Sequence, residues 1–227
     1  MKMFLFDIDG TLILTGGAGD RALDRAFFEL YKIPHAMDLV RPAGKTDPAI
    51  VREIFHEKFG RDCSADEMKQ ICKKYLEALA DEVRTSPGYH VLPGMTDILK
   101  RLSAMPDCLL GIITGNLAEG APIKLGRGDL NRYFRFGGYG SDSEDRAELT
   151  RIGIERGRKL QKVPSLNDQI YLLGDTPLDI AAGRKNGVVM ISVATGPWPY
   201  EDLKTHHPDF LFKDLSDTGA FLRAVGL

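Results

Sequence analysis

Short runs of apolar residues recur along this chain, and longer stretches with apolar positions at helical spacing separate most of them. A short apolar run between turn signals is typical of a strand that is buried on both faces. The predicted strands are Met3–Phe6, Leu109–Ile113, Ile170–Leu173, Val188–Val193 and Phe210–Phe212. Strands that alternate with helices predict an α/β fold, in which helices cover both faces of a doubly wound, mainly parallel sheet.

Three of the helical patterns carry clear terminal signals. Pro93-Gly94 precedes the pattern at 95–102, Asp145 precedes the one at 147–160, and the pattern at 178–185 stops at an Asn-Gly pair. Proline or an acidic residue favours a helix start, and glycine favours a helix end. We therefore predict crossover helices at these positions.

The interval between the first two predicted strands is too long for a single crossover. It spans about a hundred residues, whereas a crossover with one helix needs far fewer. Apolar positions at helical spacing occur around Leu23, Ile50 and Ile71. This interval therefore predicts several helices with apolar faces of their own.

Two stretches rich in glycine, serine or proline, 16–19 and 86–88, flank these helices and resemble linkers. A third such stretch, 137–140, indicates a flexible connector in the remainder of the chain. An insertion hinged beside the first strand is placed to act as a lid over a site at that strand's end. The predicted domains are an α/β core over residues 1–17 and 86–227 and an inserted α-helical cap domain over residues 18–85.

Composition narrows the class of protein. The 227 residues include 30 Lys and Arg against 32 Asp and Glu, and this near-neutral balance argues against a dedicated nucleic-acid-binding protein. No stretch approaches the ~20 apolar residues of a membrane span, and the apolar opening ends at Asp7, unlike a secretory signal. The three cysteines lack CxxC spacing, so neither a disulfide framework nor a zinc site is indicated. We expect a soluble, cytoplasmic monomer or homodimer with no nucleic-acid or membrane partner.

Polar motifs follow the first three predicted strands directly. They are Asp7-Ile8-Asp9-Gly10-Thr11, Thr114-Gly115-Asn116 and Gly174-Asp175-Thr176-Pro177-Leu178-Asp179. An isolated Asp-x-Asp is most often a turn or a helix cap, but ligands collect beyond the carboxyl ends of parallel strands, where all three motifs would meet. Carboxylates that stay ionised side by side need a cation, and hard oxygen ligands favour Mg²⁺. The three motifs together predict metal-assisted phosphoryl transfer.

In this order and spacing, the three motifs resemble those of the haloacid dehalogenase (HAD) superfamily, specifically its phosphatases with a helical cap that are similar to phosphoglycolate phosphatase. The resemblance covers nearly the whole chain. It implies a Rossmann-like core, a Mg²⁺ cofactor and a small-molecule phosphate ester as the partner. It further implies hydrolysis of a phosphorylated metabolite through a covalent aspartyl-phosphate, with phosphoglycolate as the first substrate to consider.

The resemblance also implies roles for the acidic residues. Asp7 would attack phosphorus, and Asp9 would protonate the departing alcohol and then activate water. Dehalogenase members lack a carboxylate at the position of Asp9, so this chain resembles the phosphate enzymes. Mg²⁺ would bind the Asp7 side chain, the Asp9 main-chain carbonyl and Asp175, with Asp179 as a further or outer ligand.

The phosphoryl group would be held by Thr114 through its hydroxyl and by the main-chain N–H groups of Gly115 and Asn116. The family places a basic residue, commonly in a Lys-Pro segment, before the helix that leads to the acidic motif. This sequence has no such segment there. Arg146 is our candidate for that cation, because a guanidinium suits bidentate contact with oxygens. Lys124 is the competitor, and either residue could instead be a solvated helix charge.

The segment 41–47 resembles the cap loop that reaches toward the site in similar phosphatases. Its residues Lys45, Thr46 and Asp47 could contact the leaving group. Alternatively, Thr46 or Asp47 caps a helix that begins near Pro48. The two interpretations are compatible.

Three rival functions remain open at this point. A phosphotransferase similar to β-phosphoglucomutase would use the same acid pair. A non-catalytic phosphate-binding regulatory module would keep the fold but lose a catalytic group, and all the expected groups are present here. A phosphonate hydrolase would need an activated lysine from the cap, and nothing marks Lys32 or Lys45 as activated.

Overall fold

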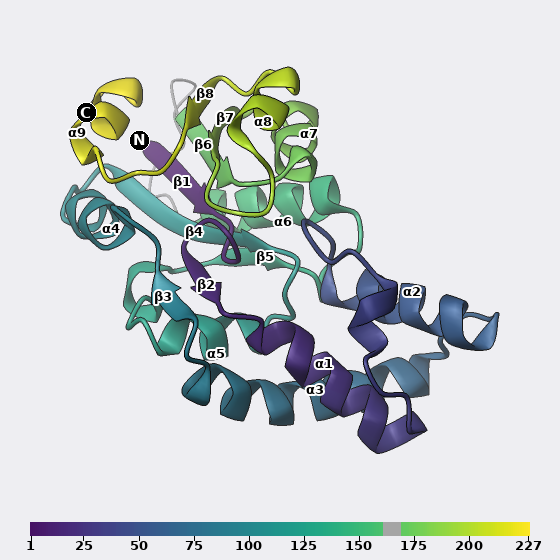
Figure 1. The fold of residues 1–227 in the computed structure, drawn as a ribbon. Coiled ribbons are helices and arrows are strands. Elements are labelled where there is room, and N and C mark those ends of the chain that lie inside the picture. The colour runs from purple at the N-terminus through teal and green to yellow at the C-terminus, as the bar shows by residue number, and fades with distance from the viewer. Residues whose placement is uncertain (161–168) are drawn as a thin grey trace.

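A computed structural model describes residues 1–160 and 169–227 of the chain. Among these residues, the main sheet has six strands in the order β5-β4-β1-β6-β7-β8, and all neighbouring strands run parallel (Figure 1). This confirms the predicted doubly wound α/β fold. The strands are β1 (Lys2–Phe6), β4 (Cys108–Thr114), β5 (Gly137–Tyr139), β6 (Gln169–Gly174), β7 (Val189–Val193) and β8 (Phe210–Phe212).

The central strand β1 shows how both faces of the sheet become buried. Successive side chains of a strand point to opposite faces, so Phe4 and Phe6 pack with one set of helices and Met3 and Leu5 with another. The first set is α4 (Met95–Ser103), α5 (Gly120–Gly126) and α9 (Thr218–Ala224). The second set is α6 (Arg146–Lys159), α7 (Pro177–Lys185) and α8 (Tyr200–Thr205).

The strand order brings the three motifs together. From β1 the chain adds β4 and β5 on one side, then returns to build β6, β7 and β8 on the other. The carboxyl ends of β4 and β6 therefore flank that of β1, where the order reverses, which is the usual ligand position in such sheets. The N–H of Asp7 donates to the carbonyl of Leu173 over 2.9 Å, so the pairing of β1 with β6 extends up to the motif.

Within the interval between β1 and β4, the first three α-helices form a helical unit with a hydrophobic core of its own, built around Phe27, Phe55 and Leu79. The unit lies beyond the carboxyl ends of the strands (Figure 1). The predicted helices are confirmed, whereas the domain limits at 17/18 and 85/86 stay a prediction. No described helix has the length and apolar character needed to cross a bilayer. The elements of the unit are α1 (Ala18–Tyr31), the 3₁₀ helix η1 (Ala36–Leu39), α2 (Asp47–Phe59) and α3 (Ala65–Thr85). Outside this unit, a second 3₁₀ helix, η2 (Asn131–Tyr133), follows α5.

The expectation of a flexible connector at 137–140 is wrong, because Gly137–Tyr139 is the edge strand β5. A Cβ atom on Gly138 would lie 2.0 Å from the main-chain oxygen of Leu149 in α6. The glycine therefore permits close packing of a helix on a strand.

The two expected linkers are more ordered than the sequence predicted. The first linker follows β2 (Ile13–Thr15) and the second precedes β3 (Tyr89–Val91). These two strands pair as an antiparallel sheet that the sequence did not predict. The linkers run side by side, since a Cβ on Gly16 would lie 2.6 Å from the Cα of Gly88. The helical unit is thus joined to the sheet by a close-packed double connection.

Candidate active site

Three buried carboxylates meet at the carboxyl ends of β1 and β6. Asp7 follows β1, Asp175 follows β6, and Asp179 lies in the first turn of α7. One oxygen from each lies within 4.8 Å of the others. The strand ends thus bring together residues more than 160 positions apart.

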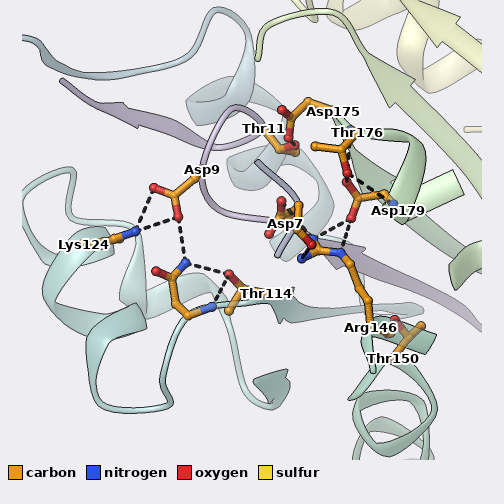
Figure 2. Close-up of polar contacts among 12 residues, drawn as sticks. Asp7, Asp9, Thr11, Thr114, Lys124, Arg146, Thr150, Asp175, Thr176 and Asp179 are labelled. Carbon is orange, nitrogen blue, oxygen red and sulfur yellow. Dashed lines mark hydrogen bonds and ion pairs between the residues drawn. The ribbon is translucent and has the colours of Figure 1, made fainter. Parts of the chain in front are cut away.

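Arg146, the first residue of α6, lies among these carboxylates (Figure 2). Its Nη2 is 3.0 Å from Oδ2 of Asp7 and 2.6 Å from Oδ1 of Asp179, and its Nε donates to the same Asp179 oxygen over 2.7 Å. The guanidinium is almost fully buried. We call Arg146, Asp7, Asp175 and Asp179 the Arg146 cluster.

Asp179 has little free capacity as a ligand. Its Oδ2 accepts hydrogen bonds from the hydroxyl and the main-chain N–H of Thr176, at 2.6 and 3.1 Å. With Arg146 on the other oxygen, both oxygens of Asp179 are engaged. Asp179 therefore caps α7 and orients the guanidinium.

Asp175 lies in a tight cradle. The hydroxyl of Thr11 donates to its Oδ1 over 3.0 Å. A Cβ on Gly10 would lie 2.4 Å from Oδ2 of Asp175, and a Cβ on Gly196 would lie 1.7 Å from it. The main chain of two loops therefore approaches this carboxylate so closely that only glycine fits at these positions.

The Arg146 cluster contains three carboxyl groups but only one positively charged side chain. Burial raises the pKa of Asp7 from 3.8 to about 7, although Arg146 opposes this shift. Burial and the neighbouring Asp7 and Asp179 also raise the pKa of Asp175 well above its usual range. A divalent cation would restore the ionised forms, and an all-oxygen donor set suits Mg²⁺. The residues present therefore fit a magnesium ion.

Asp9, only two residues from Asp7, has different surroundings (Figure 2). Lys124 Nζ lies 2.8 and 3.0 Å from its two oxygens, and Asn116 Nδ2 donates to it over 2.7 Å. Its side chain is 43% exposed, while that of Lys124 is buried. Asp9 is thus held in place but still faces solvent. The two cations considered for the phosphate both reach the site: Arg146 contacts Asp7, and Lys124 contacts Asp9.

The motif after β4 supplies a hydroxyl and a main-chain junction. Thr114 is buried, lines the same cavity and accepts a 2.7 Å hydrogen bond from the Asn116 amide. The carbonyl of Gly115 accepts from the N–H of Asp47 over 2.8 Å, and a Cβ on Gly115 would lie 2.1 Å from the Lys45 carbonyl. Gly115 therefore joins the core to the segment that leads into α2.

The three residues predicted to contact the leaving group differ in position. Thr46 is the N-cap of α2, accepting from the N–H of Ala49, and is not among the residues that line the cavity. Lys45 lines the cavity but its ammonium pairs with Glu53. Asp47 also lines it, is buried, and accepts from the N–H of Leu117 over 2.9 Å. The helix-cap interpretation of Thr46 is confirmed.

The cavity has a volume of about 460 Å³ and extends from the Arg146 cluster to the helical unit. Its walls include residues that the sequence analysis did not single out as site residues: Asp20, Tyr75, Thr176 and Thr195. Thr176 lies inside a recognised motif, so its type and place were a usable signal. Asp20 and Tyr75 lie on helices with no motif, and nothing in the sequence marks them.

Asp9, Asp20 and Asp47 all interact electrostatically with the ammonium of Lys124. We call these four residues the Lys124 cluster. Burial raises the pKa of Asp47 from 3.8 to about 6, and Lys124 opposes this shift. The hydroxyl of the buried Tyr75 interacts with Asp47 as well. The cluster combines residues from the core and from the helical unit.

Known proteins share sequence and fold with this chain. The model of the haloacid dehalogenase-like hydrolase family matches residues 4–193. The chain is 26% identical to phosphoglycolate phosphatase from Aquifex aeolicus over 96% of its length and 94% of the relative's. It is 25% identical to pyrophosphatase PpaX from Listeria monocytogenes over 96% of its length and 95% of the relative's. A hydrolase from Pseudomonas syringae shares the fold at a TM-score of 0.74 and 19% identity, with 99% of each chain covered. The chain therefore belongs to the haloacid dehalogenase-like hydrolases, as its three motifs predicted.

Proposed function

We propose that this protein is a Mg²⁺-dependent phosphomonoesterase that hydrolyses a small phosphorylated metabolite through a covalent aspartyl-phosphate on Asp7. The observation that carries this proposal is the contrast between Asp7 and Asp9. Asp7 is buried beside Arg146, whereas Asp9 faces the cavity on Lys124 and Asn116. Two carboxylates in different surroundings suit the two roles that the reaction needs.

In the first step, an oxygen of Asp7 forms a bond to phosphorus as the ester P–O bond breaks. The proton required by the departing alkoxide comes from Asp9, which faces the same cavity. In the second step, Asp9 takes a proton from water, the water oxygen attacks phosphorus, and the bond between Asp7 and phosphorus breaks. Inorganic phosphate and free Asp7 result, and Asp9 is again protonated for the next cycle.

The phosphoryl oxygens would be bound by the Thr114 hydroxyl and the main-chain N–H groups of Gly115 and Asn116. Arg146 would contact the same group while Asp179 holds its guanidinium in place. Asp7 and Asp175, with the Asp9 carbonyl, would hold Mg²⁺, and Asp179 would take an outer position because both of its oxygens already accept hydrogen bonds. When bound, Mg²⁺ would neutralise charge on the carboxylates and on the transferring group.

The relatives define the substrates to test first. One is named for phosphoglycolate and another for pyrophosphate. Both are small phosphorylated compounds, and a cavity of about 460 Å³ accommodates a leaving group of a few carbon atoms.

The decisive experiment measures phosphate release from p-nitrophenyl phosphate with Mg²⁺ or with EDTA. We expect metal-dependent release by the native protein and a rate lower by about 10³-fold or more in Asp7→Asn. In Asp9→Asn, nitrophenolate leaves without a proton but water is not activated, so intact mass spectrometry should detect one phosphoryl group on the protein. Turnover by Asp7→Asn above a tenth of the native rate would refute the mechanism. Transfer of the phosphoryl group to an added sugar phosphate, in preference to water, would instead identify a phosphotransferase.

A further inference from the structure

The wall of the cavity opposite the Arg146 cluster comes from the helical unit. Its apolar part is formed by Leu23, Met37 and Ile50, and its polar part includes Asp20 and Tyr75. A phosphoryl group bound at Asp7 would point its leaving group at this wall. The side chains on this wall are therefore the ones that would contact the leaving group.

Among the described residues that line the cavity, every basic side chain is already paired with a carboxylate. Their basic side chains are Lys45, Lys124 and Arg146. Lys45 is paired with Glu53 and Lys124 with Asp9. Arg146 is held inside the Arg146 cluster. A carboxylate on the substrate would have to displace one of these pairs.

The Lys124 cluster has an excess of negative charge. One ammonium faces the carboxylates of Asp9, Asp20 and Asp47. Asp20, in the first turn of α1, lines the cavity, stays exposed, and forms no hydrogen bond or ion pair within the described parts of the chain. Its neighbour Gly19 lies close to Lys124, since a Cβ on Gly19 would be 3.4 Å from the Lys124 Nζ, and the Asp20 carboxylate interacts electrostatically with the same ammonium. The Asp20 carboxylate is thus free to accept hydrogen bonds from a ligand.

We propose that the physiological leaving group is an alcohol without negative charge, whose hydroxyl or ammonium groups donate hydrogen bonds to Asp20. This proposal rests on the proposed phosphatase function and specifies its substrate class. A hydroxyl or ammonium donor satisfies the Asp20 carboxylate, while a substrate carboxylate or second phosphate meets like charge without a free cation. Phosphoglycolate and pyrophosphate are therefore poor substrates, although relatives are named for them.

Three esters with the same two-carbon skeleton isolate the charge of the leaving group. Phosphoglycolate ends in a carboxylate, 2-hydroxyethyl phosphate in a hydroxyl, and phosphoethanolamine in an ammonium group. We expect kcat/KM for the hydroxyl and ammonium esters to exceed that for phosphoglycolate by roughly tenfold or more, with the difference mainly in KM. Phosphoglycolate as the best of the three would overturn the proposal.

The variant Asp20→Asn removes the charge but keeps a side chain of the same shape. It should lower kcat/KM for phosphoethanolamine and raise it for phosphoglycolate, each relative to p-nitrophenyl phosphate, which lacks both groups. Asp38→Asn is the matched control, since Asp38 is exposed on the same unit and does not line the cavity. The proposal fails if Asp20→Asn, like Asp38→Asn, leaves the relative kcat/KM values of the three esters unchanged. Failure of the phosphatase function is distinct, because p-nitrophenyl phosphate would then also remain intact in the presence of Mg²⁺.

Discussion

The Arg146 cluster and the Lys124 cluster each surround one buried cation with three carboxylates, yet they are built differently. All members of the Arg146 cluster follow strands or begin helices of the core, and its guanidinium bridges two fixed carboxylates. The Lys124 cluster takes Asp9 from the core but Asp20 and Asp47 from the helical unit. A planar guanidinium fixes geometry, whereas an ammonium on a flexible stem tolerates rearrangement. We infer that the first cluster holds the nucleophile and the phosphoryl group, whereas the second joins the general acid and base Asp9 to residues that face the leaving group.

The largest expected effect tests the chemical role of the Arg146 cluster. Asp7→Asn should reduce kcat by about 10³-fold or more with any ester, since the neighbouring Asp179 is held by Arg146 and Thr176 and Asp175 by Thr11. Asp38→Asn should keep native turnover. Steady-state phosphate release with Mg²⁺ measures both. A residual rate above a tenth of the native rate in Asp7→Asn would show that the nucleophile is another group.

The structural role of the same cluster is tested by Arg146→Met. Removing the guanidinium leaves Asp7 and Asp179 as buried carboxylates without their cation, which should lower the free energy of unfolding by about 3–5 kcal/mol. Chemical denaturation at pH 7.5 in EDTA measures this loss.

Arg101→Met is a suitable control for that measurement, because Arg101 forms an exposed surface pair with Asp97. It should cost at most about 1 kcal/mol. Equal losses in the two variants would mean that the Arg146 cluster contributes no more to folding than a surface pair.

The Lys124 cluster makes a pH-dependent prediction. The pKa of Asp47 is raised in the folded protein from 3.8 to about 6, so the folded state binds a proton more readily than the unfolded state. Ionised Asp47 therefore destabilises the protein above about pH 6 by up to ~3 kcal/mol, and this cost disappears as the pH falls toward 4. Asp47→Asn should thus be more stable than the native protein at pH 7.5, with a gain that shrinks between pH 6 and pH 4.

Thermal denaturation of both proteins across this pH range measures the effect. The asparagine can still accept the hydrogen bond from Leu117, so lost bonding should not mask the gain. A constant difference between pH 4 and pH 7.5 would contradict the raised pKa.

The smallest expected effect concerns Gly115, where the core meets the segment that leads into α2. Gly115→Ala would bring a Cβ to 2.1 Å from the Lys45 carbonyl, so the chain leading into α2 must move away. We expect a loss of about 1–3 kcal/mol in the free energy of unfolding. Gly120→Ala is the matched control, because its Cβ would meet side chains only at 3.5 Å and alanine favours the helix. Equal stability of the two variants would mean that the chain leading into α2 can move away from Gly115 without a loss in the free energy of unfolding.

The strands and the motifs at their ends could be predicted because their signal lies in a few consecutive residues. A buried parallel strand is a continuous apolar run, and the polar residues that follow it must lie at the ligand-binding edge. Asp7, Thr114 and Asp175 could be placed in this way. The short strand Gly137–Tyr139 could not, because it contains no apolar run: Gly138 instead lets the main chain of α6 pack closely on the strand.

The sequence by itself determined the α/β class, the helical insertion and the carboxylates that meet at one sheet edge. Only the tertiary structure decided that Arg146 pairs with Asp7 while Lys124 pairs with Asp9, and that Asp20 and Tyr75 line the cavity. The reason is physical. A motif at a strand end inherits its position from the sheet, whereas a charge on a helix surface gains a role only when packing brings it against a distant partner.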